Sequence, residues 1–406
     1  MSTPAAQPLP ATQSLPAAQP LPATQSLPAA QPLPLAGVRI LAVEQYGAGP
    51  FGSMHLADLG AEVIKIEPPG GGDVSRATGP HFLGPDDSQF FQTFNRNKAS
   101  VVLDLKSEAG RADFHRLVAG ADAVLNNLRG DQPAKLGLTQ AALAAVNPRI
   151  VCGHLSAYGR DNERAGWPGY DYLMQAEAGY MHLTGEPDGP PSRMGLSMVD
   201  YMSGVTLAVG LLAALLSAFK TGRGRDVDVS LFDVALFQLT YPATWYLNGA
   251  HMTQRQPRSA HPATVPCQLF ATADSHLFLM CMTPKFWDLL VDEIGAPALR
   301  DPRFATLALR RANRAELIPL LDAEFAVRST AGWLAALGGK VPIAPVLDIA
   351  GALCSPYVQQ VGMLQPLPHA ADPGFRVLAN PIKLDGQRLP GQACSALGAD
   401  NARLLG

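Results

Sequence analysis

The sequence lacks an excess of one charge, paired cysteines and any recognisable set of metal ligands. Its 31 Lys and Arg residues nearly balance its 34 Asp and Glu residues, and the formal net charge is −3. Without a basic block, nucleic acid is not expected as a partner. The five cysteines are scattered and none forms a CxxC pair, so neither a disulfide framework nor a zinc site is predicted. Unpaired thiols favour a reducing compartment, and we expect a cytoplasmic protein.

A membrane-spanning segment is not expected either. Residues 204–219 are markedly apolar, but this run is shorter than the roughly 20 residues that cross a bilayer. Serines flank it, and the basic sequence "KTGRGR" follows. We therefore expect a helix buried inside a globular domain, and no membrane as a partner.

The first 34 residues are rich in proline and repetitive. The sequence "AAQPLPATQSLP" occupies residues 5–16, recurs at 17–28 and begins again at 29. Each unit is too short and too rich in proline to bury a face, so a repeat fold is not predicted. No basic segment precedes an apolar one, which argues against a signal peptide. We expect residues 1–34 to form a disordered tail without a catalytic role.

The chain of 406 residues is long enough for one large or two moderate domains. From residue 38 onward, short apolar runs alternate with helical patterns. We expect strands at residues 38–43, 61–69 and 149–158, among others, and a helix over 107–121 with Ser107 as its N-cap. This alternation predicts an α/β fold with a parallel sheet covered by helices. Ligands of such sheets bind at the carboxyl ends of the strands. Beyond about residue 240 the pattern changes to antiparallel strands and amphipathic helices, and strand-like pieces return near the C-terminus. We expect a large domain over 35–239, a small α+β domain over 240–335 and a C-terminal part over 336–406.

Two glycine clusters allow several interpretations. "YGAGPFG" (46–52) follows a predicted strand and begins a helix, but its spacing is not the GxGxxG of dinucleotide-binding proteins. It can be a turn that starts a helix with Pro50 as the first residue, or a binding turn for a phosphate-bearing or acyl ligand. "PPGGGDVSR" (68–76) can be a flexible loop. A nicotinamide-dependent oxidoreductase is therefore disfavoured but remains an alternative from another class.

Taken in order, these pieces resemble the family III coenzyme A transferases, which include formyl-CoA, carnitine-CoA and succinate-dependent dicarboxylate-CoA transferases. The resemblance begins with "GVRILAVEQYGAGPFGSMHLADLGAEVIKIEPPGGGDVSR" and continues through "FNRNKASVVLDLKSEAG", "GYDYLMQAEAGYMHLTGEPDGPPSRMGLSMVDYMSG" and "KTGRGRDVDVSLFDVAL". It implies a Rossmann-like large domain built from both ends of the chain, a smaller inserted domain, and two chains interlocked as a homodimer. It also implies that acyl-CoA and a carboxylic acid are the substrates, with no permanently bound cofactor.

Asp200 precedes the apolar run, and two roles are open to it. The residues alone favour an acid at the start of a helix, where free amides and the helix dipole stabilise a negative charge. The resemblance implies the catalytic nucleophile, which would form an aspartyl anhydride and then an aspartyl-CoA thioester. The helix start would keep this carboxylate ionised.

The resemblance also places coenzyme A on the loops that follow the first strands. Backbone amides near Gly47 and Gly49 would approach the oxyanions of the reaction. Taken singly, Lys106, Arg129 and Lys135 are each interpreted as a solvated surface charge. Taken together, they are candidate partners for the phosphates of coenzyme A. The expected coenzyme A contacts are Gly47, Leu103, Lys106, Asn127, Arg129 and Lys135.

Related acyl-CoA racemases and epimerases are the alternative within the same superfamily. They carry a histidine where this chain has Tyr170, and tyrosine is a poor base at neutral pH because its pKa lies near 10. The neighbouring Asp171 is interpreted as a structural acid that orients its segment. Formyl-CoA transferases differ from this chain at Gln45, Gly47 and Pro68, which argues against a formyl or oxalate specificity. The segment "SRMGLSMVD" resembles the succinate-dependent dicarboxylate branch instead.

Overall fold

Six parallel strands form the main sheet of the computed structural model, which describes residues 31–406. Most of the predicted tail (1–34) therefore lies outside the described residues. The strand order is β5-β2-β1-β6-β7-β8, so these strands, taken in chain order, lie 3-2-1-4-5-6, as in a doubly wound sheet. Their bounds are β1 Arg39–Val43, β2 Glu62–Glu67, β5 Lys98–Val102, β6 Ala123–Asn126, β7 Val151–Ser156 and β8 Asp226–Ser230.

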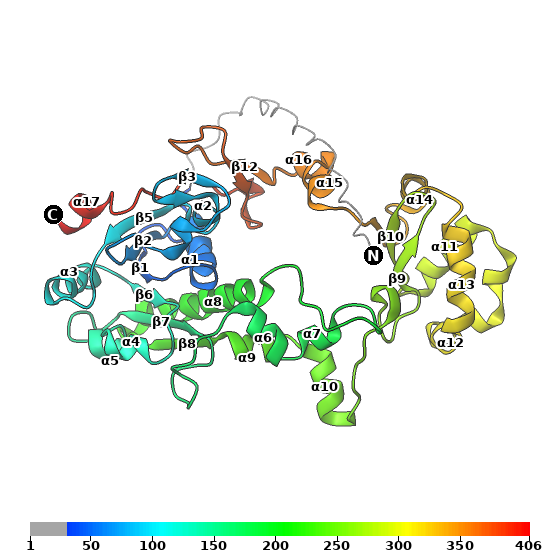
Figure 1. The fold of residues 1–406 in the computed structure, drawn as a ribbon, viewed down its shortest axis with the longest axis horizontal. Helices are drawn as coiled ribbons and strands as arrows, with labels where there is room; N and C mark the ends of the chain where they lie inside the picture. The colour runs from blue at the N-terminus through cyan, green and yellow to red at the C-terminus, as the bar shows by residue number, and fades with distance from the viewer. Residues whose placement is uncertain (1–30) are drawn as a thin grey trace, which may run out of the picture.

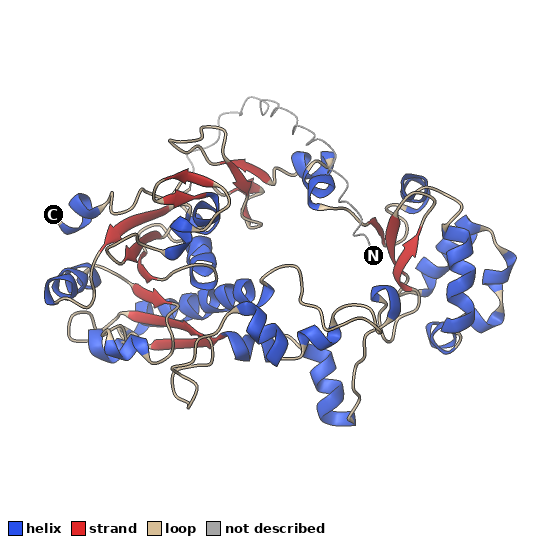
Figure 2. Cartoon of the chain, in the orientation of Figure 1, coloured by secondary structure: helices blue, strands red, loops and turns tan. Residues whose placement is uncertain are grey.

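Helices cover both faces of this sheet, because successive side chains of each strand point to opposite sides (Figures 1 and 2). Ile40 and Ala42 of β1 pack on one face, and Leu41 and Val43 pack on the other. The helices of this part of the chain are α1 Ala48–Asp58, α2 Gln89–Asn95, α3 Glu108–Ala119, α4 Gln132–Lys135, α5 Gln140–Leu143, α6 Asp171–Glu177, α7 Tyr180–Leu183, α8 Met198–Thr221, α9 Leu231–Phe237 and α10 Thr240–Gly249. Ser107, the predicted N-cap of α3, accepts a hydrogen bond from the amide of Gly110 at 3.0 Å.

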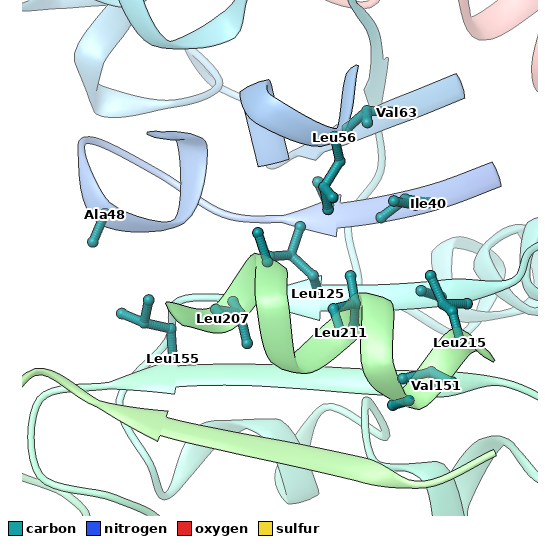
Figure 3. Close-up of a cluster of buried hydrophobic side chains, with 14 of the residues drawn as sticks. Ile40, Ala48, Leu56, Val63, Leu125, Val151, Leu155, Leu207, Leu211 and Leu215 are labelled. Atoms are coloured by element: carbon teal, nitrogen blue, oxygen red, sulfur yellow. The ribbon is translucent and has the colours of Figure 1, made fainter. Parts of the chain in front are cut away.

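The predicted apolar helix is α8, which extends at both ends beyond the apolar run. By length and composition it is the one helix among residues 31–406 that could cross a bilayer. One of its faces is core, because Leu207, Leu211 and Leu215 are buried against the sheet and α1 (Figure 3). The opposite face is exposed at Val209, Leu216 and Phe219.

A second hydrophobic core lies in residues 265–343 and contains Trp287, Leu321, Phe325 and Trp333. It joins an antiparallel sheet of order β11-β10-β9 to the helices α11, α13 and α14. The third strand of this sheet lies beyond residue 335, where the sequence placed the end of the small domain. The bounds are β9 Cys267–Ala271, β10 His276–Met280, α11 Pro284–Ile294, α12 Leu307–Ala312, α13 Arg314–Phe325, α14 Thr330–Leu337 and β11 Ile343–Pro345.

The end of the chain returns to the parallel sheet and runs along its edge strand β5. The amide of Asp400 donates to the carbonyl of Ser100 at 3.1 Å, and the side chain of Asn401 accepts from the amide of Val102 at 2.9 Å. Figure 1 shows this red segment beside the cyan strand. The remaining elements are β3 Phe82–Gly84, β4 Asp87–Ser88, α15 Ile349–Leu353, α16 Pro356–Gln360, β12 Leu364–Pro366, β13 Arg376–Leu378, β14 Lys383–Leu384, β15 Gln387–Arg388 and α17 Asn401–Leu405.

Candidate active site

A pocket of about 410 Å³ lies where the order of the parallel strands reverses, at the carboxyl ends of β1 and β6. Chains that leave neighbouring strands in opposite directions separate there and leave room for a ligand. The loop after β1 contributes Gln45, Tyr46 and Gly47, and the loop after β6 contributes Asn127 and Arg129. Further lining residues follow β7 or begin later helices: Leu155, Ser156, Ala157, Trp167, Pro168, Gly169, Tyr170, Asp200 and Leu231.

Asp200 enters this pocket from the first turn of α8. Its carboxylate lies against the backbone of Gly47, since a Cβ placed on that glycine would be 3.2 Å from Oδ2 of Asp200. Its amide donates to Oδ2 of Asp171 at 3.0 Å. Asp171 is itself buried and accepts from Nε2 of Gln175 at 2.5 Å. The carboxylate of Asp171 thus fixes the start of α8, as expected of an orienting acid.

Burial raises the pKa of Asp200 to about 7, and the negative charge of Asp171 acts in the same direction. The sequence predicts the opposite influence, because a helix start favours an ionised carboxylate. The difference arises from tertiary packing, which removes water from the carboxylate and brings a second acid close to it.

Two glycines allow the starts of α1 and α8 to touch. A Cβ on Gly204 would lie 2.9 Å from the amide nitrogen of Gly52 and closer still to the carbonyl oxygen of Ala48. A Cβ on Gly52 would in turn clash with the carbonyl oxygen of Gly204. Only glycine permits this approach, which brings Asp200 on α8 to the first residues of α1.

The start of α1 offers backbone N–H groups to the pocket. Gly47 is the N-cap and no side chain caps this helix among the described residues. The first amides of a helix have no partner within the helix, so those of Ala48 and Gly49 are suited to hold a negatively charged oxygen. Pro50 is the third residue of α1 and not the first, as the sequence suggested.

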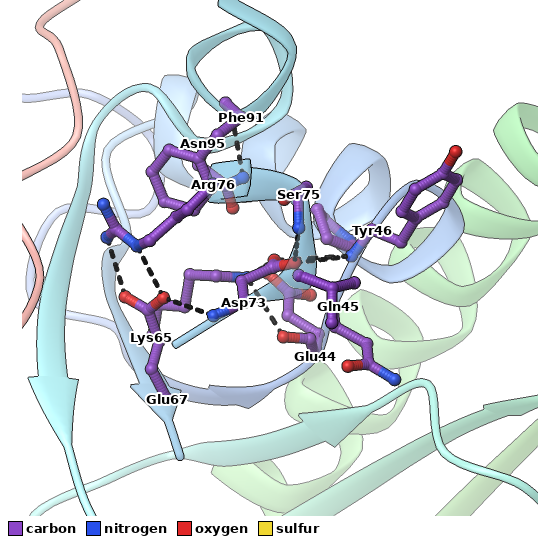
Figure 4. Close-up of polar contacts among 12 residues, drawn as sticks. Glu44, Gln45, Tyr46, Lys65, Glu67, Asp73, Ser75, Arg76, Phe91 and Asn95 are labelled. Atoms are coloured by element: carbon purple, nitrogen blue, oxygen red, sulfur yellow. Dashed lines mark hydrogen bonds and ion pairs between the residues drawn. The ribbon is translucent and has the colours of Figure 1, made fainter. Parts of the chain in front are cut away.

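Buried charges lie beneath this turn (Figure 4). Lys65 is fully buried and its Nζ lies 2.8 Å from Oδ2 of Asp73. Arg76 pairs with Glu67 at 2.8 Å and is also buried. Residues 68–76 were open to interpretation as a flexible loop, but Asp73 and Arg76 anchor this segment in the protein.

This chain is similar to known proteins over most of its length. The family model described as CoA-transferase family III matches residues 35–401. The chain belongs to this family. The resemblance noted in the sequence is thereby confirmed, and the protein is a CoA-transferase, an enzyme class that uses CoA thioesters as substrates.

Named relatives and a solved structure cover most of this family III chain. It is 37% identical over 342 residues to an acetyl-CoA:oxalate CoA-transferase of Acetobacter aceti, which covers 83% of this chain and 86% of the relative. It is 34% identical over 336 residues to a succinate–glutarate CoA-transferase of Agrobacterium fabrum, covering 81% and 84%. The crystal structure of a CAIB/BAIF family protein from Brucella suis matches with a TM-score of 0.80 and 31% identity, covering 92% of this chain and 99% of that one.

The predicted site residues of this family III protein fall into two groups. Gly47, Asn127, Arg129 and Asp200 line one pocket. The side chain of Asn127 is occupied by the main chain of Gln45, accepting from its amide at 2.9 Å and donating to its carbonyl at 2.7 Å. Arg129 donates to the carbonyl of Gly166 at 3.2 Å, lies 3.7 Å from Oδ1 of Asp131 and is half exposed.

The other three predicted residues do not line this pocket. Leu103 is buried in the core at the carboxyl end of β5, so its side chain is not available to a ligand. Lys106 follows β5 and is exposed. Lys135 on α4 is exposed and pairs with Asp131 at 2.6 Å.

Several lining residues were not predicted from the sequence, notably Tyr46, Gln132 and Trp167. Tyr46 could have been found, because it directly precedes Gly47 after the first strand. Trp167 lies far beyond the end of β7 and gives no local signal. Within residues 31–406 no group of three His, Cys, Asp or Glu side chains is placed to hold a metal ion.

Proposed function

We propose that Asp200 is the nucleophile that carries first an acyl group and then coenzyme A. The observation that supports this role most directly is its position in the pocket, against the backbone of Gly47, the N-cap of α1. A pKa of about 7 leaves a sizeable ionised fraction at neutral pH. A carboxylate that burial makes more basic is also a better nucleophile than one exposed to water.

The reaction begins when an Asp200 carboxylate oxygen attacks the thioester carbonyl of the donor. The carbon–sulfur bond breaks, coenzyme A leaves as thiolate, and the donor acyl group remains on Asp200 as a mixed anhydride. The thiolate then attacks the aspartyl carbonyl, which releases the donor acid and leaves an aspartyl-CoA thioester. The amides of Ala48 and Gly49 would stabilise the oxyanions of these steps.

The acceptor acid completes the exchange by the same steps in reverse. Its carboxylate attacks the aspartyl thioester, which forms a second anhydride and releases the thiolate. The thiolate attacks the acceptor carbonyl and frees the carboxylate of Asp200. No proton is gained or lost overall, so the site needs a nucleophile and oxyanion donors and no strong acid.

For the substrates, we propose acyl-CoA together with a small carboxylic acid, with dicarboxylates as the first candidates. The support is that named relatives act on oxalate, succinate and glutarate. Coenzyme A would follow the carboxyl edge of the sheet from the pocket at Gly47, Asn127 and Arg129 towards Lys106 and Lys135. Leu103 would contribute through its backbone. We propose no permanently bound cofactor.

We also propose an interlocked homodimer with a large domain built from both ends of the chain. The contacts of residues 392–401 with β5 support the second part. Support for the first part comes from the apolar surface left bare on α8, α9 and α10. Phe237 is 84% exposed, Leu247 is 78% exposed, and α10 has no buried residue. Two separate stretches of chain connect the two cores (Figure 1).

The test is CoA exchange between an acyl-CoA and an isotopically labelled acid, followed by mass spectrometry. We expect exchange, and a hydroxylamine-sensitive adduct on Asp200 that is absent from Asp200→Asn. The substitution is expected to lower kcat at least about a thousandfold, since it removes the group that forms the covalent intermediates. Native exchange by Asp200→Asn would contradict the proposal. Loss of the substrate α-proton without an acceptor acid would instead support a racemase, which the absence of a histidine at Tyr170 disfavours.

A further inference from the structure

The turn between β1 and α1 contains a residue in an unfavourable backbone conformation. Tyr46 has φ of +68°, in the left-handed region that bulky residues avoid. The next residue is Gly47, whose backbone lies against the carboxylate of Asp200. A conformation of this kind persists only where the surroundings hold it, and such residues cluster at functional sites.

Asp73 is the group that holds Tyr46. The amide of Tyr46 donates to both carboxylate oxygens of Asp73, at 3.1 and 3.3 Å. The same carboxylate accepts from the amide of Ser75 at 2.8 Å and pairs with the ammonium of Lys65 at 2.8 Å. Asp73 is only 1% exposed, so water cannot substitute for it.

Two buried lysines fix the chain on either side of Tyr46, and Figure 4 shows the first of them, Lys65. Lys65 also donates to the carbonyl of Glu44 at 3.0 Å, just before the turn. Lys98 donates to the carbonyl of Pro50 at 3.0 Å, just after it, and pairs with the Glu44 carboxylate at 2.8 Å. The turn is therefore held at its start, at Tyr46 and at the first turn of α1. None of these groups except Tyr46 lines the pocket.

We propose that Asp73 is a positioning residue for CoA transfer. By keeping Tyr46 in the left-handed conformation, it holds the backbone of Gly47 and the amides that follow it against the carboxylate of Asp200. Asp73 touches neither substrate nor the reacting atoms and acts through the main chain. This inference rests on the proposed role of Asp200.

The first test is Asp73→Asn in the full-length enzyme. The amide side chain accepts hydrogen bonds less strongly than a carboxylate and leaves Lys65 without its charged partner. We expect kcat to fall about a hundredfold, as when an oxyanion donor is lost, with KM for the acyl-CoA changed less than about threefold. Native kcat in a folded Asp73→Asn enzyme would overturn the proposal.

A comparison at residue 46 separates positioning from a general loss of structure. Tyr46→Ala and Tyr46→Gly both remove the ring, but only glycine adopts a positive φ without cost. We therefore expect Asp73→Asn to lower kcat about a hundredfold in the Tyr46→Ala background and less than about tenfold in the Tyr46→Gly background. Equal losses in the two backgrounds would show that Asp73 does not act through the conformation of Tyr46.

Asp122→Asn is the matched control. Asp122 accepts a hydrogen bond from the amide of Arg39 at 2.9 Å, at the opposite end of the same strand. It therefore has the same kind of contact far from the pocket, and we expect kcat to change less than about twofold. A loss of kcat as large as that of Asp73→Asn would contradict a specific role for Asp73.

Two further measurements keep the inference testable. If Asp73→Asn does not fold, Asp73→Glu keeps the charge beside Lys65 but moves its oxygens by one methylene, and it should fold with reduced kcat. Native kcat in Asp73→Glu would then count against the proposal. If the native enzyme transfers CoA to none of the acids tested, the proposed function fails. A crystal structure of either folded variant still tests the role of Asp73. An unchanged backbone conformation of Tyr46 in that structure would refute this role.

Discussion

The parallel sheet and the antiparallel sheet of this protein are stabilised in different ways. Around the parallel sheet, Lys65 and Lys98 are buried with their carboxylate partners, and Tyr46 has a strained backbone. The antiparallel region is built from aromatic and aliphatic side chains, with Phe325 between Phe270 and Trp333 at ring distances of 4.8 and 4.9 Å. Buried ion pairs thus lie beneath the pocket, whereas Arg310, the buried cation of the antiparallel region, donates to the main-chain carbonyls of Val265 and Phe304.

This contrast indicates that the two regions have different tasks. Ionic groups in a core are costly to bury and stabilise less than an apolar core of the same volume. The ionic groups beneath the turn after β1 are explained if they hold the backbone of the pocket in position and do not only stabilise the fold. The antiparallel region then supplies stability, and its helices begin at ordinary caps such as Thr283 and Ser329. Four predictions test this division.

The largest expected effect on stability is that of Trp333→Ala in the antiparallel region. Trp333 is 1% exposed and its indole N–H donates to the carbonyl of Phe325 at 2.9 Å. Its removal leaves a cavity and should lower the free energy of unfolding of this region by about 3–5 kcal/mol. Urea denaturation measures this loss, and kcat at low temperature should remain native. Trp333→Phe is the control with a smaller loss, and a fall in kcat of the still folded alanine variant would contradict the division.

Gly204→Ala should affect both stability and activity. The added Cβ clashes with the backbone of α1 and forces α1 and α8 apart, at a cost of about 1–3 kcal/mol. Because Asp200 and Gly47 lie on the two sides of this contact, we also expect kcat to fall more than about tenfold. Gly249→Ala in α10 is the control, since a Cβ there meets nothing within 4 Å. An unchanged kcat in Gly204→Ala would mean that the helix contact does not set the site.

Asp200→Asn should change the pH dependence of stability. Burial raises the pKa of Asp200 to about 7 in the folded protein, above its ordinary value of 3.8. The folded state therefore holds a proton that the unfolded state has lost between about pH 4 and 7, and this group lowers stability as the pH rises through that window. Asparagine removes the effect, so the variant should gain stability relative to the native enzyme at pH 8 but not at pH 4. We expect a difference on the order of 1 kcal/mol in denaturation at the two pH values. An equal change in stability at pH 4 and at pH 8 would contradict the raised pKa of Asp200.

The smallest effects are expected for the exposed cations. Both Arg129 and Lys135 pair with Asp131, at 3.7 and 2.6 Å, but only Arg129 of the two lines the pocket. We expect Arg129→Ala to raise KM for the acyl-CoA about fivefold and Lys135→Ala about twofold, with kcat nearly unchanged, because exposed ion pairs contribute little. Steady-state kinetics at two salt concentrations measures both KM values. A larger rise in KM for Lys135→Ala than for Arg129→Ala would place coenzyme A along a different path.

Much of the fold was predictable because it depends on local patterns. The strands at residues 38–43, 61–69 and 149–158, the N-cap Ser107 and the long apolar helix all follow from hydrophobic periodicity and capping chemistry. The turn after the first strand and Asp200 were also predicted to lie at one site, and both line the pocket. The prediction that Asp200 is a nucleophile and not only a helix-capping acid comes from the resemblance and not from the pattern.

The rest depended on contacts between residues distant in the sequence. Asp73 lies 27 residues from Tyr46, and nothing local indicates that its carboxylate binds that amide. The raised pKa of Asp200 depends first on burial and then on the charge of Asp171, which is 29 residues away. Leu103 was expected at the ligand, but it follows a strand with its side chain in the core. Such placements require the three-dimensional arrangement of the strands.

The contact between Gly52 and Gly204 has a practical consequence for protein engineering. Because two main chains touch there, no side chain separates the starts of α1 and α8. Aromatic residues of the pocket that lie outside this contact and outside the turn after β1, such as Trp167, can then be exchanged to admit bulkier or more branched acids. A library that leaves the two glycines untouched should shift substrate preference while the reactive centre stays intact.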